Sequence, residues 1–144
     1  MTATVERGFR VARRSDATIP RDTEVIVGDS MGEMLVYYGG ARAVVMGGTL
    51  CGTGGQNLIE PCAMGVPVVL GPSVFNFQQA AHEAVAAGAA VNVPHAEAAL
   101  DVVLVWLRDE ASRASVGAKA KAKAFVAAHQ GATERTVALM SLDP

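Results

Sequence analysis

Short apolar runs alternate along this chain with segments whose apolar residues recur at helical spacing. The apolar runs have the length and composition of strands and lie at 9–15, 24–29, 42–48, 66–71 and 89–93. The segments of helical period lie at 31–40, 58–64, 77–88, 96–109, 113–130 and 132–140. This alternation predicts an α/β fold in which helices cover a parallel sheet and the strands are buried on both faces.

The composition is that of one folded globular domain. Hydrophobic residues make up 51% and charged residues 18% of the 144 positions, which argues against a disordered chain. Because 12 Lys and Arg face 14 Asp and Glu, the net charge is −2, and nucleic acid is not an expected partner. The chain has neither a run of about 18 apolar residues nor an apolar leader. A cytoplasmic protein is therefore expected, with Cys51 and Cys62 as reduced thiols.

A glycine-rich stretch stands between the third predicted strand and the helix that follows it. Residues 47–65 read GGTLCGTGGQNLIEPCAMG, with five glycines in the first nine positions. The spacing Asn57-x-x-Glu60 resembles a capping box, in which side chains bond the first free N–H groups of a helix. Ser30-x-x-Glu33, after the second strand, is such a box. Each helix is therefore predicted to begin where a buried strand ends.

The carboxyl edge of a parallel sheet is where α/β folds bind their ligands. A helix start offers unpaired N–H groups and the positive end of the helix dipole, and glycines let a phosphate approach both. The Glu60 carboxylate could then accept hydrogen bonds from two ribose hydroxyls, which favours a nucleotide or nucleotide sugar over free phosphate. The alternative is that Asn57 and Glu60 only cap a helix, while the glycines only turn the chain.

Several other conspicuous residues favour structural roles. The three histidines, His82, His95 and His129, fit no metal-ligand spacing, so no metal is expected. Trp106 lies at helical spacing with a set of aliphatic residues, and this stripe predicts core packing. The aliphatic members are Leu100, Val103, Leu104 and Leu107.

Three motifs together carry a family resemblance. In order, GDSMGEM (28–34), GGTLCGTGGQNLIEPCAMGVPVVLGP (47–72) and FNFQQAAHEAVAAGAA (75–90) resemble the C-terminal half of bacterial 3-deoxy-D-manno-octulosonic acid (Kdo) transferases. That family consists of GT-B glycosyltransferases, which are built from two Rossmann-like domains. The resemblance covers nearly the whole chain. It implies that residues 1–144 form one partial C-terminal nucleotide-sugar-binding domain, with a Rossmann-like parallel sheet flanked by helices and without the N-terminal acceptor domain.

The resemblance also implies a reaction and a setting. Members of this family transfer Kdo from CMP-Kdo to the lipid A precursor during lipopolysaccharide biosynthesis, at the cytoplasmic face of the inner membrane. The acceptor and the catalytic carboxylate belong to the N-terminal domain. We therefore expect this chain to bind CMP-Kdo or CMP, to contain no catalytic residue, to use no metal or other cofactor, and to be inactive alone.

By motif match, the donor nucleotide site of this chain comprises Met31, Gly32, Glu33, Gly54, Gly55, Gln56, Asn57 and Glu60. The resemblance implies that Met31 and Gly32 line the nucleotide site, with Glu33 at the head of its helix. It implies that Gly54, Gly55 and Asn57 meet the phosphate and that Glu60 takes the ribose hydroxyls. Gln56 stands where the family usually has His.

Other interpretations remain open at this stage. The chain could be the C-terminal domain of another GT-B glycosyltransferase that uses a UDP-sugar, or a non-catalytic remnant that acts as an interaction module. Asn76 could touch donor or acceptor, or could cap the helix that follows it. Arg14, with its neighbour Arg13, could bring positive charge to the site or could simply end a solvated strand. Exposure of Val137 and Met140 on the last helix would favour self-association.

Overall fold

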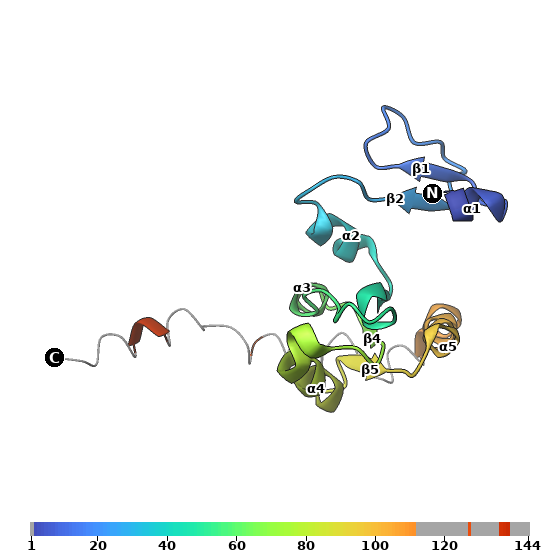
Figure 1. Cartoon of the computed structure of the whole chain (residues 1–144). Coiled ribbons are helices and arrows are strands. Elements are labelled where there is room, and N and C mark those ends of the chain that lie inside the picture. Colours follow the sequence, from blue (N-terminus) through green and yellow to red (C-terminus); the bar gives the residue numbers. More distant parts are fainter. Residues whose placement is uncertain (1, 112–126, 128–135, 139–144) are drawn as a thin grey trace. The chain divides into compact units, whose positions relative to one another are not determined.

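The computed structural model describes residues 2–111, 127 and 136–138 (Figure 1). The chain divides into two compact units, Met1–Met34 and Leu35–Pro144. Of the helix predicted at 113–130, only Ala127 falls among the described residues, and the rest lies outside them. Of the helix predicted at 132–140, residues 136–138 are described and are helical, and Val137 is 56% exposed. Met140 and His129 lie outside the described residues.

The first unit contains a short helix and a two-stranded parallel sheet. Its elements are α1 (Thr2–Glu6), β1 (Val11–Arg13) and β2 (Val25–Val27), with Val11 opposite Val25 in the register. Ala12 at the centre of β1 is buried, but Ile26 at the centre of β2 is 51% exposed. The prediction that every strand is buried on both faces is therefore wrong for β2.

The second unit is built on a three-stranded sheet. Its strands β3 (Val44–Met46), β4 (Val68–Leu70) and β5 (Ala90–Asn92) lie in the order β3-β4-β5, and both pairings are parallel. The predicted α/β fold with parallel strands flanked by helices is thus confirmed. The strands of the two units form two separate sheets, however, rather than the single sheet that the alternation predicted.

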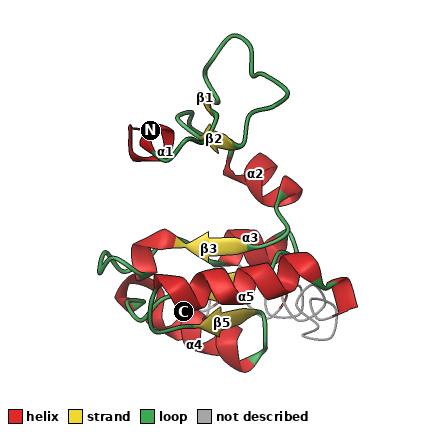
Figure 2. Cartoon of the chain, turned by 90° about the vertical axis from the view of Figure 1, so that its right-hand side faces the viewer, coloured by secondary structure: helices red, strands yellow, loops and turns green. Residues whose placement is uncertain are grey.

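Successive side chains of β4 enter opposite layers of helices, because neighbouring residues of a strand point to opposite faces. Val68 and Leu70 pack in a core cluster with residues of α3 (Ile59–Ala63) and α4 (Gln78–Ala86). Val69 packs in a second cluster, which includes Trp106 of α5 (Ala96–Arg108). Figure 1 shows α3 and α4 on one side of β4 and β5, with α5 on the other. Figure 2 shows α5 running across the face of this sheet. The central strand is therefore covered on both faces.

The helix after β2 begins later than the capping-box pattern predicted. The structure places α2 at Met34–Gly40, so Ser30 is not the residue before its first turn, and this boundary of the prediction is wrong. Gly32 has a φ of +79°, and a left-handed residue cannot continue a right-handed helix. The turn therefore has to finish before α2 starts.

The apolar stripe of α5 is wider than its buried face. Ala99 and Trp106 are buried, and Val102 and Val103 pack against them. In contrast, Leu100, Leu104 and Leu107 are 60%, 42% and 41% exposed in the described structure, so core packing was the wrong prediction for these three. A residue one position along a helix points about 100° away from its neighbour, which takes Leu100 off the face that Ala99 shares with Trp106. Among the described helices, none has the length and hydropathy needed to cross a membrane.

Candidate functional site

The glycine-rich loop between β3 and α3 depends on glycine for two separate physical reasons. Gly52, Gly54 and Gly55 have φ angles of +77°, +83° and +78°, a region that other residues avoid. A Cβ atom at Gly54 would also lie 2.7 Å from the Nδ2 atom of Asn76, and one at Gly55 would lie 2.6 Å from Cγ2 of Thr49. Backbone conformation and packing therefore both require glycine at 54 and 55, whatever the loop binds.

Thr49 joins the loop to the end of the neighbouring strand. It ends a short 3-10 turn, η1 (Gly47–Thr49), and is 2% exposed. Its hydroxyl donates a hydrogen bond of 2.6 Å to the carbonyl of Met46 and accepts one of 2.5 Å from the N–H of Gly71. Its carbonyl accepts a 3.0 Å bond from the N–H of Ser73. The ends of β3 and β4 are thus joined by one buried side chain, which the sequence motifs did not single out.

Asn76 holds the other side of the same loop. It lies in the 3-10 turn η2 (Phe75–Phe77), before α4. Its Nδ2 atom donates to the carbonyl of Thr53 at 3.0 Å and to the carbonyl of Gly55 at 3.4 Å. Helix α4 has Phe77 at its N-cap position and no side-chain cap. Of the two roles left open for Asn76 by the sequence, the helix cap is therefore wrong, because its amide is used on the loop.

The loop presents a run of backbone N–H groups without protein acceptors. Within the described part of the chain, the N–H groups of residues 54–58 donate to no backbone or side-chain oxygen. Gly54 and Gly55 are nevertheless buried, and buried N–H groups almost always have a partner. Successive N–H groups in a glycine turn form an anion-binding concavity. We call residues 54–58 the donor run, because their N–H groups are hydrogen-bond donors without protein acceptors among the described residues.

Asn57 and Glu60 are joined as their spacing predicted. The Oδ1 atom of Asn57 accepts from the N–H of Ile59 at 3.0 Å, and its Nδ2 atom donates to Oε1 of Glu60 at 3.1 Å. The second carboxylate oxygen of Glu60, Oε2, accepts from no residue that the structure describes. Helix α3 has only five residues, so its dipole adds little to an anion site. An anion at this loop would therefore be held by the N–H groups of the donor run more than by the dipole of α3.

Tyr38 is a neighbour of Glu60 that the motifs did not reveal. It lies on α2 and is 7% exposed. Burial raises the pKa of Tyr38 above its ordinary value of 10.0, and the charge of the Glu60 carboxylate raises it further. The Tyr38 hydroxyl therefore stays protonated at neutral pH and remains a hydrogen-bond donor.

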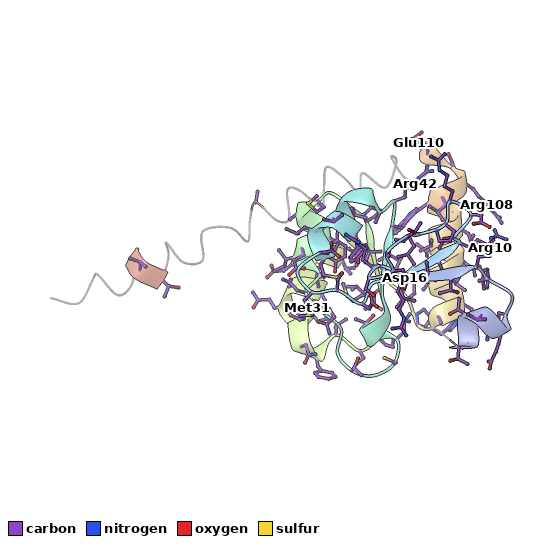
Figure 3. All side chains as sticks on the ribbon, turned by 90° about the horizontal axis from the view of Figure 1, so that it is seen from above. Arg10, Asp16, Met31, Arg42, Arg108 and Glu110 are labelled. Atoms are coloured by element: carbon purple, nitrogen blue, oxygen red, sulfur yellow. The ribbon has the colours of Figure 1, made fainter. Side chains whose placement is uncertain are left out.

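Three of the predicted site residues belong to the first unit, and the other five belong to the second. Met31, labelled in Figure 3, is 96% exposed, and Gly32 is exposed beside it. Glu33 is bound on two sides: its Oε1 pairs with Nη2 of Arg14 at 2.8 Å, and its Oε2 accepts from the hydroxyl of Ser30. The positive charge of Arg14 is therefore already paired within its own unit.

The neighbouring turn of the first unit is held by a carboxylate. The Oδ1 and Oδ2 atoms of Asp29 accept from the N–H and the hydroxyl of Ser15 at 3.0 Å and 2.7 Å. The hydrogen bond from the Ser15 hydroxyl is the main cause that lowers the pKa of Asp29 below 3.8. The GDSMGE motif thus contains carboxylates with structural partners within the first unit.

An open pocket of about 520 Å³ lies at the turn that follows β4. Its lining combines apolar and polar side chains from the loop after β4, from η2 and from the first half of α4. These residues are Pro72, Ser73, Val74, Phe75, Gln78 and His82. Phe75 also touches the glycine loop, because a Cβ atom on Gly54 would lie 2.7 Å from its Cζ atom. The pocket wall is therefore continuous with the loop that carries the donor run.

The two histidines among the described residues are exposed, and both cysteines are free thiols. His82 and His95 are exposed, and Nδ1 of His95 accepts from the N–H of Ala98 at 3.3 Å as the cap of α5. Across the described residues, no group of three or more His, Cys, Asp or Glu side chains is placed to hold a metal ion. Cys51 and Cys62 are free thiols, as predicted.

The fold and the loop define a class of protein. A family model described as glycosyl transferases group 1 matches residues 11–123, and the chain belongs to this family. The relatives found by sequence are more specific. A 3-deoxy-D-manno-octulosonic acid transferase of Bordetella pertussis is 48% identical over 114 residues, which are 79% of this chain and 26% of that protein. The same enzyme of Haemophilus influenzae is 43% identical over 72 residues, which are 49% of this chain and 17% of that protein.

A solved structure agrees with these relatives. The C-terminal CMP-Kdo binding domain of WaaA from Acinetobacter baumannii matches with a TM-score of 0.74 and 31% sequence identity, over 84% of this chain and 64% of that one. The predicted resemblance to the C-terminal half of Kdo transferases is therefore confirmed. The chain spans about a quarter of the length of the Bordetella relative.

Proposed function

We propose that this chain is the donor-binding part of a Kdo transferase and that it binds CMP-Kdo through the donor run and Glu60. The observation that carries the proposal is the juxtaposition of N–H groups lacking acceptors at 54–58 with a carboxylate held three residues after Asn57. We choose CMP-Kdo as the proposed ligand because the name of the similar Acinetobacter domain states that it binds CMP-Kdo.

The donor run suits the phosphate of a nucleotide sugar. A CMP-linked sugar carries one phosphodiester, with a single negative charge and oxygens that only accept hydrogen bonds. Hydrogen bonds from backbone N–H groups to such an anion are charge-assisted and roughly twice as strong as neutral ones. Gly54 and Gly55 have no Cβ to keep the anion away. A single charged phosphate therefore satisfies several N–H groups that the protein leaves without acceptors.

Glu60 suits the ribose of the same nucleotide. Asn57 holds one carboxylate oxygen of Glu60 at 3.1 Å and leaves the other without a donor from the described residues. Two vicinal hydroxyls can donate to one carboxylate, because an ionised carboxylate only accepts hydrogen bonds and has about four lone-pair sites. We infer that Glu60 binds the 2′- and 3′-hydroxyls, with its rotamer restricted by Asn57.

We further propose that the complete enzyme transfers Kdo to the lipid A precursor in lipopolysaccharide biosynthesis, at the cytoplasmic face of the inner membrane. The acceptor and the catalytic base would come from the part of the longer relatives that this chain does not span. The chain alone would then bind the donor without turning it over. The roles of Met31, Gly32, Glu33 and Gln56 in nucleotide binding stay predictions.

Calorimetric titration of the folded chain tests the donor site. We expect CMP to bind more tightly than UMP, cytidine or 2′-deoxy-CMP. Cytidine lacks the phosphate that we assign to the donor run, and 2′-deoxy-CMP lacks one of the two hydroxyls that we assign to Glu60. Glu60→Gln should weaken CMP about tenfold or more, since a hydrogen bond to a charged group contributes about 1.5–3 kcal/mol. The matched control is Glu97→Gln, which removes an exposed carboxylate on α5 and should leave CMP affinity unchanged.

Three results would contradict the proposal. Equal affinity of wild type and Glu60→Gln for CMP would remove Glu60 from the site. If a folded wild-type sample binds no nucleotide, the loop is only a scaffold, and a non-catalytic interaction module becomes the better description. Preference for UMP over CMP would instead favour a transferase that uses a UDP-sugar.

A further inference from the structure

The turn before α4 reaches across to the glycine loop through one side chain. Asn76 is separated from Thr53 by 23 residues and from Gly55 by 21, yet its amide nitrogen donates to both carbonyls. We propose that Asn76 is a positioning residue that aims the N–H groups of the donor run at the phosphate. This inference rests on the proposed function, because it assigns a cause to the phosphate affinity of the same loop.

The orientation of the Asn76 amide follows from its neighbours. Both partners are carbonyl oxygens, which accept hydrogen bonds and cannot donate them. Only the NH₂ side of the amide can therefore face the loop, and its two hydrogens match the two acceptors. The Oδ1 atom of Asn76 has no donor among the described residues.

Holding these carbonyls also orients particular N–H groups. In a trans peptide the C=O of one residue and the N–H of the next point in opposite directions within one plane, and the described backbone contains no cis peptide. Fixing the carbonyl of Thr53 toward Asn76 therefore turns the N–H of Gly54 away from Asn76. Fixing the carbonyl of Gly55 does the same for the N–H of Gln56. Two members of the donor run are thus aimed by one side chain.

The loop needs such a restraint because its own residues supply little. Gly54 and Gly55 follow each other, and glycine has the largest conformational freedom of any residue. The part of the loop before Gly54 is held by Thr53, whose N–H and hydroxyl donate to the carbonyl of Gly48 at 3.1 Å and 3.0 Å. Beyond Thr53, Asn76 supplies the side-chain bond to the carbonyl of Gly55, and it packs so closely that a Cβ on Gly54 would overlap it.

The test separates the phosphate-dependent part of binding from the rest. We would measure the affinities of wild type and Asn76→Ala for CMP and for cytidine, using the full chain and amide NMR titration. We expect Asn76→Ala to lose about tenfold in CMP affinity, on the order of one charge-assisted hydrogen bond, while cytidine affinity stays unchanged. We expect the amide signals of Gly54 and Gln56 to shift on CMP addition in wild type and to respond more weakly in Asn76→Ala.

A matched control removes the same kind of bond elsewhere. The amide nitrogen of Asn92 donates to the carbonyl of Gly71 at 3.3 Å, so Asn92→Ala deletes an amide–carbonyl bond without touching Thr53 or Gly55. It should leave the ratio of CMP to cytidine affinity unchanged. If Asn76→Ala fails to fold, Asn76→Leu keeps a similar volume, offers no donor and adds no charge, and it should show the same selective loss for CMP.

The outcomes distinguish this inference from the proposed function. If wild type binds no CMP, the proposed function fails and this inference falls with it. If wild type binds CMP and the Asn76 variants bind it within twofold, only the positioning role is overturned. It is also overturned if CMP and cytidine affinities fall together, because Asn76 would then merely stabilise the fold.

Discussion

The hydroxyl of Thr49 accepts the backbone N–H of Gly71 over 2.5 Å, across 22 residues of chain. Thr49 ends the turn after β3, and Gly71 directly follows β4, so this bond joins two neighbouring strand ends. A Cβ atom at Gly71 would lie 2.6 Å from the carbonyl oxygen of Thr49. The two residues thus form a close backbone contact that needs a hydroxyl on one side and glycine on the other.

Replacing the Thr49 hydroxyl with a methyl group should destabilise the protein. Thr49→Val leaves the N–H of Gly71 and the carbonyl of Met46 without their buried partner, and each such loss costs about 1–3 kcal/mol. Urea denaturation should show a lower midpoint with an unchanged slope. Thr49→Ser keeps both hydrogen bonds and should retain most of the stability. Equal losses in the two variants would show that the methyl group, and not the hydroxyl, matters.

Gly55→Ala should be far more harmful than Gly47→Ala, although both change the same loop. At Gly55 the φ of +78° strains any other residue, and the new Cβ would lie 2.6 Å from Thr49. At Gly47 nothing lies within 4 Å, and φ is not in the left-handed range. We expect Gly55→Ala to cost about 1–3 kcal/mol or more and Gly47→Ala to cost little, measured as melting temperatures. Similar melting temperatures for the two variants would contradict this geometry.

The two cysteines should differ in their reaction with a thiol reagent. Cys51 is exposed and Cys62 is buried, and burial raises the pKa of the Cys62 thiol to about 11. Because the thiolate is the reactive form, Ellman's reagent at pH 8 should modify one thiol in the native protein and two in denaturant. Cys51→Ser should abolish the native reaction. Rapid modification of Cys62 in that variant would show that the core around α3 opens easily.

The same thiol should make the folded state less stable in alkaline solution. An unfolded Cys62 loses its proton near pH 9.0, whereas the folded thiol keeps it until about pH 11. Between these values the folded state binds more protons than the unfolded state, so the free energy of unfolding falls as pH rises. Tyr38, whose pKa is also raised, acts in the same direction.

Urea denaturation at several pH values from about 8 to 11 would measure this effect, because the series starts below the unfolded pKa of 9.0 and ends at the folded pKa of about 11. Cys62→Ala should be less stable at pH 8, because it leaves a small cavity, but its stability should decline less steeply with pH. An identical decline in wild type and Cys62→Ala would assign the alkaline effect to other groups.

Features that depend on neighbours in the sequence were predictable. The strand positions follow from local apolar runs, and the end of α4 follows from Gly88, whose φ is +68°. The pairing of Asn57 with Glu60 joins residues three apart, a spacing that brings side chains together whenever a helix starts. The membership of the chain in a glycosyltransferase family followed from the motifs, which are also local strings.

Features that depend on burial were less predictable. Ile26 and Val45 sit at the centres of apolar runs, yet they are 51% and 40% exposed. Leu100 belongs to an apolar stripe and is exposed as well. A periodic pattern shows which side chains share a face but not how much of that face a neighbouring element covers. The breadth of the buried surface is therefore set by packing, which no single segment specifies.

By itself, the sequence determined the kind of each strand and α-helix from β1 to α5 and the family of the chain, because these depend on backbone sterics and apolar spacing within short segments. Only the tertiary structure decided which side chains shape the candidate site. Thr49 reaches Gly71, Asn76 reaches Thr53, and Tyr38 lies near Glu60. Hydrogen bonds and charge interactions act over a few ångströms of space. Partners about twenty residues apart are therefore brought together only when parallel strands place successive turns at one edge of the sheet.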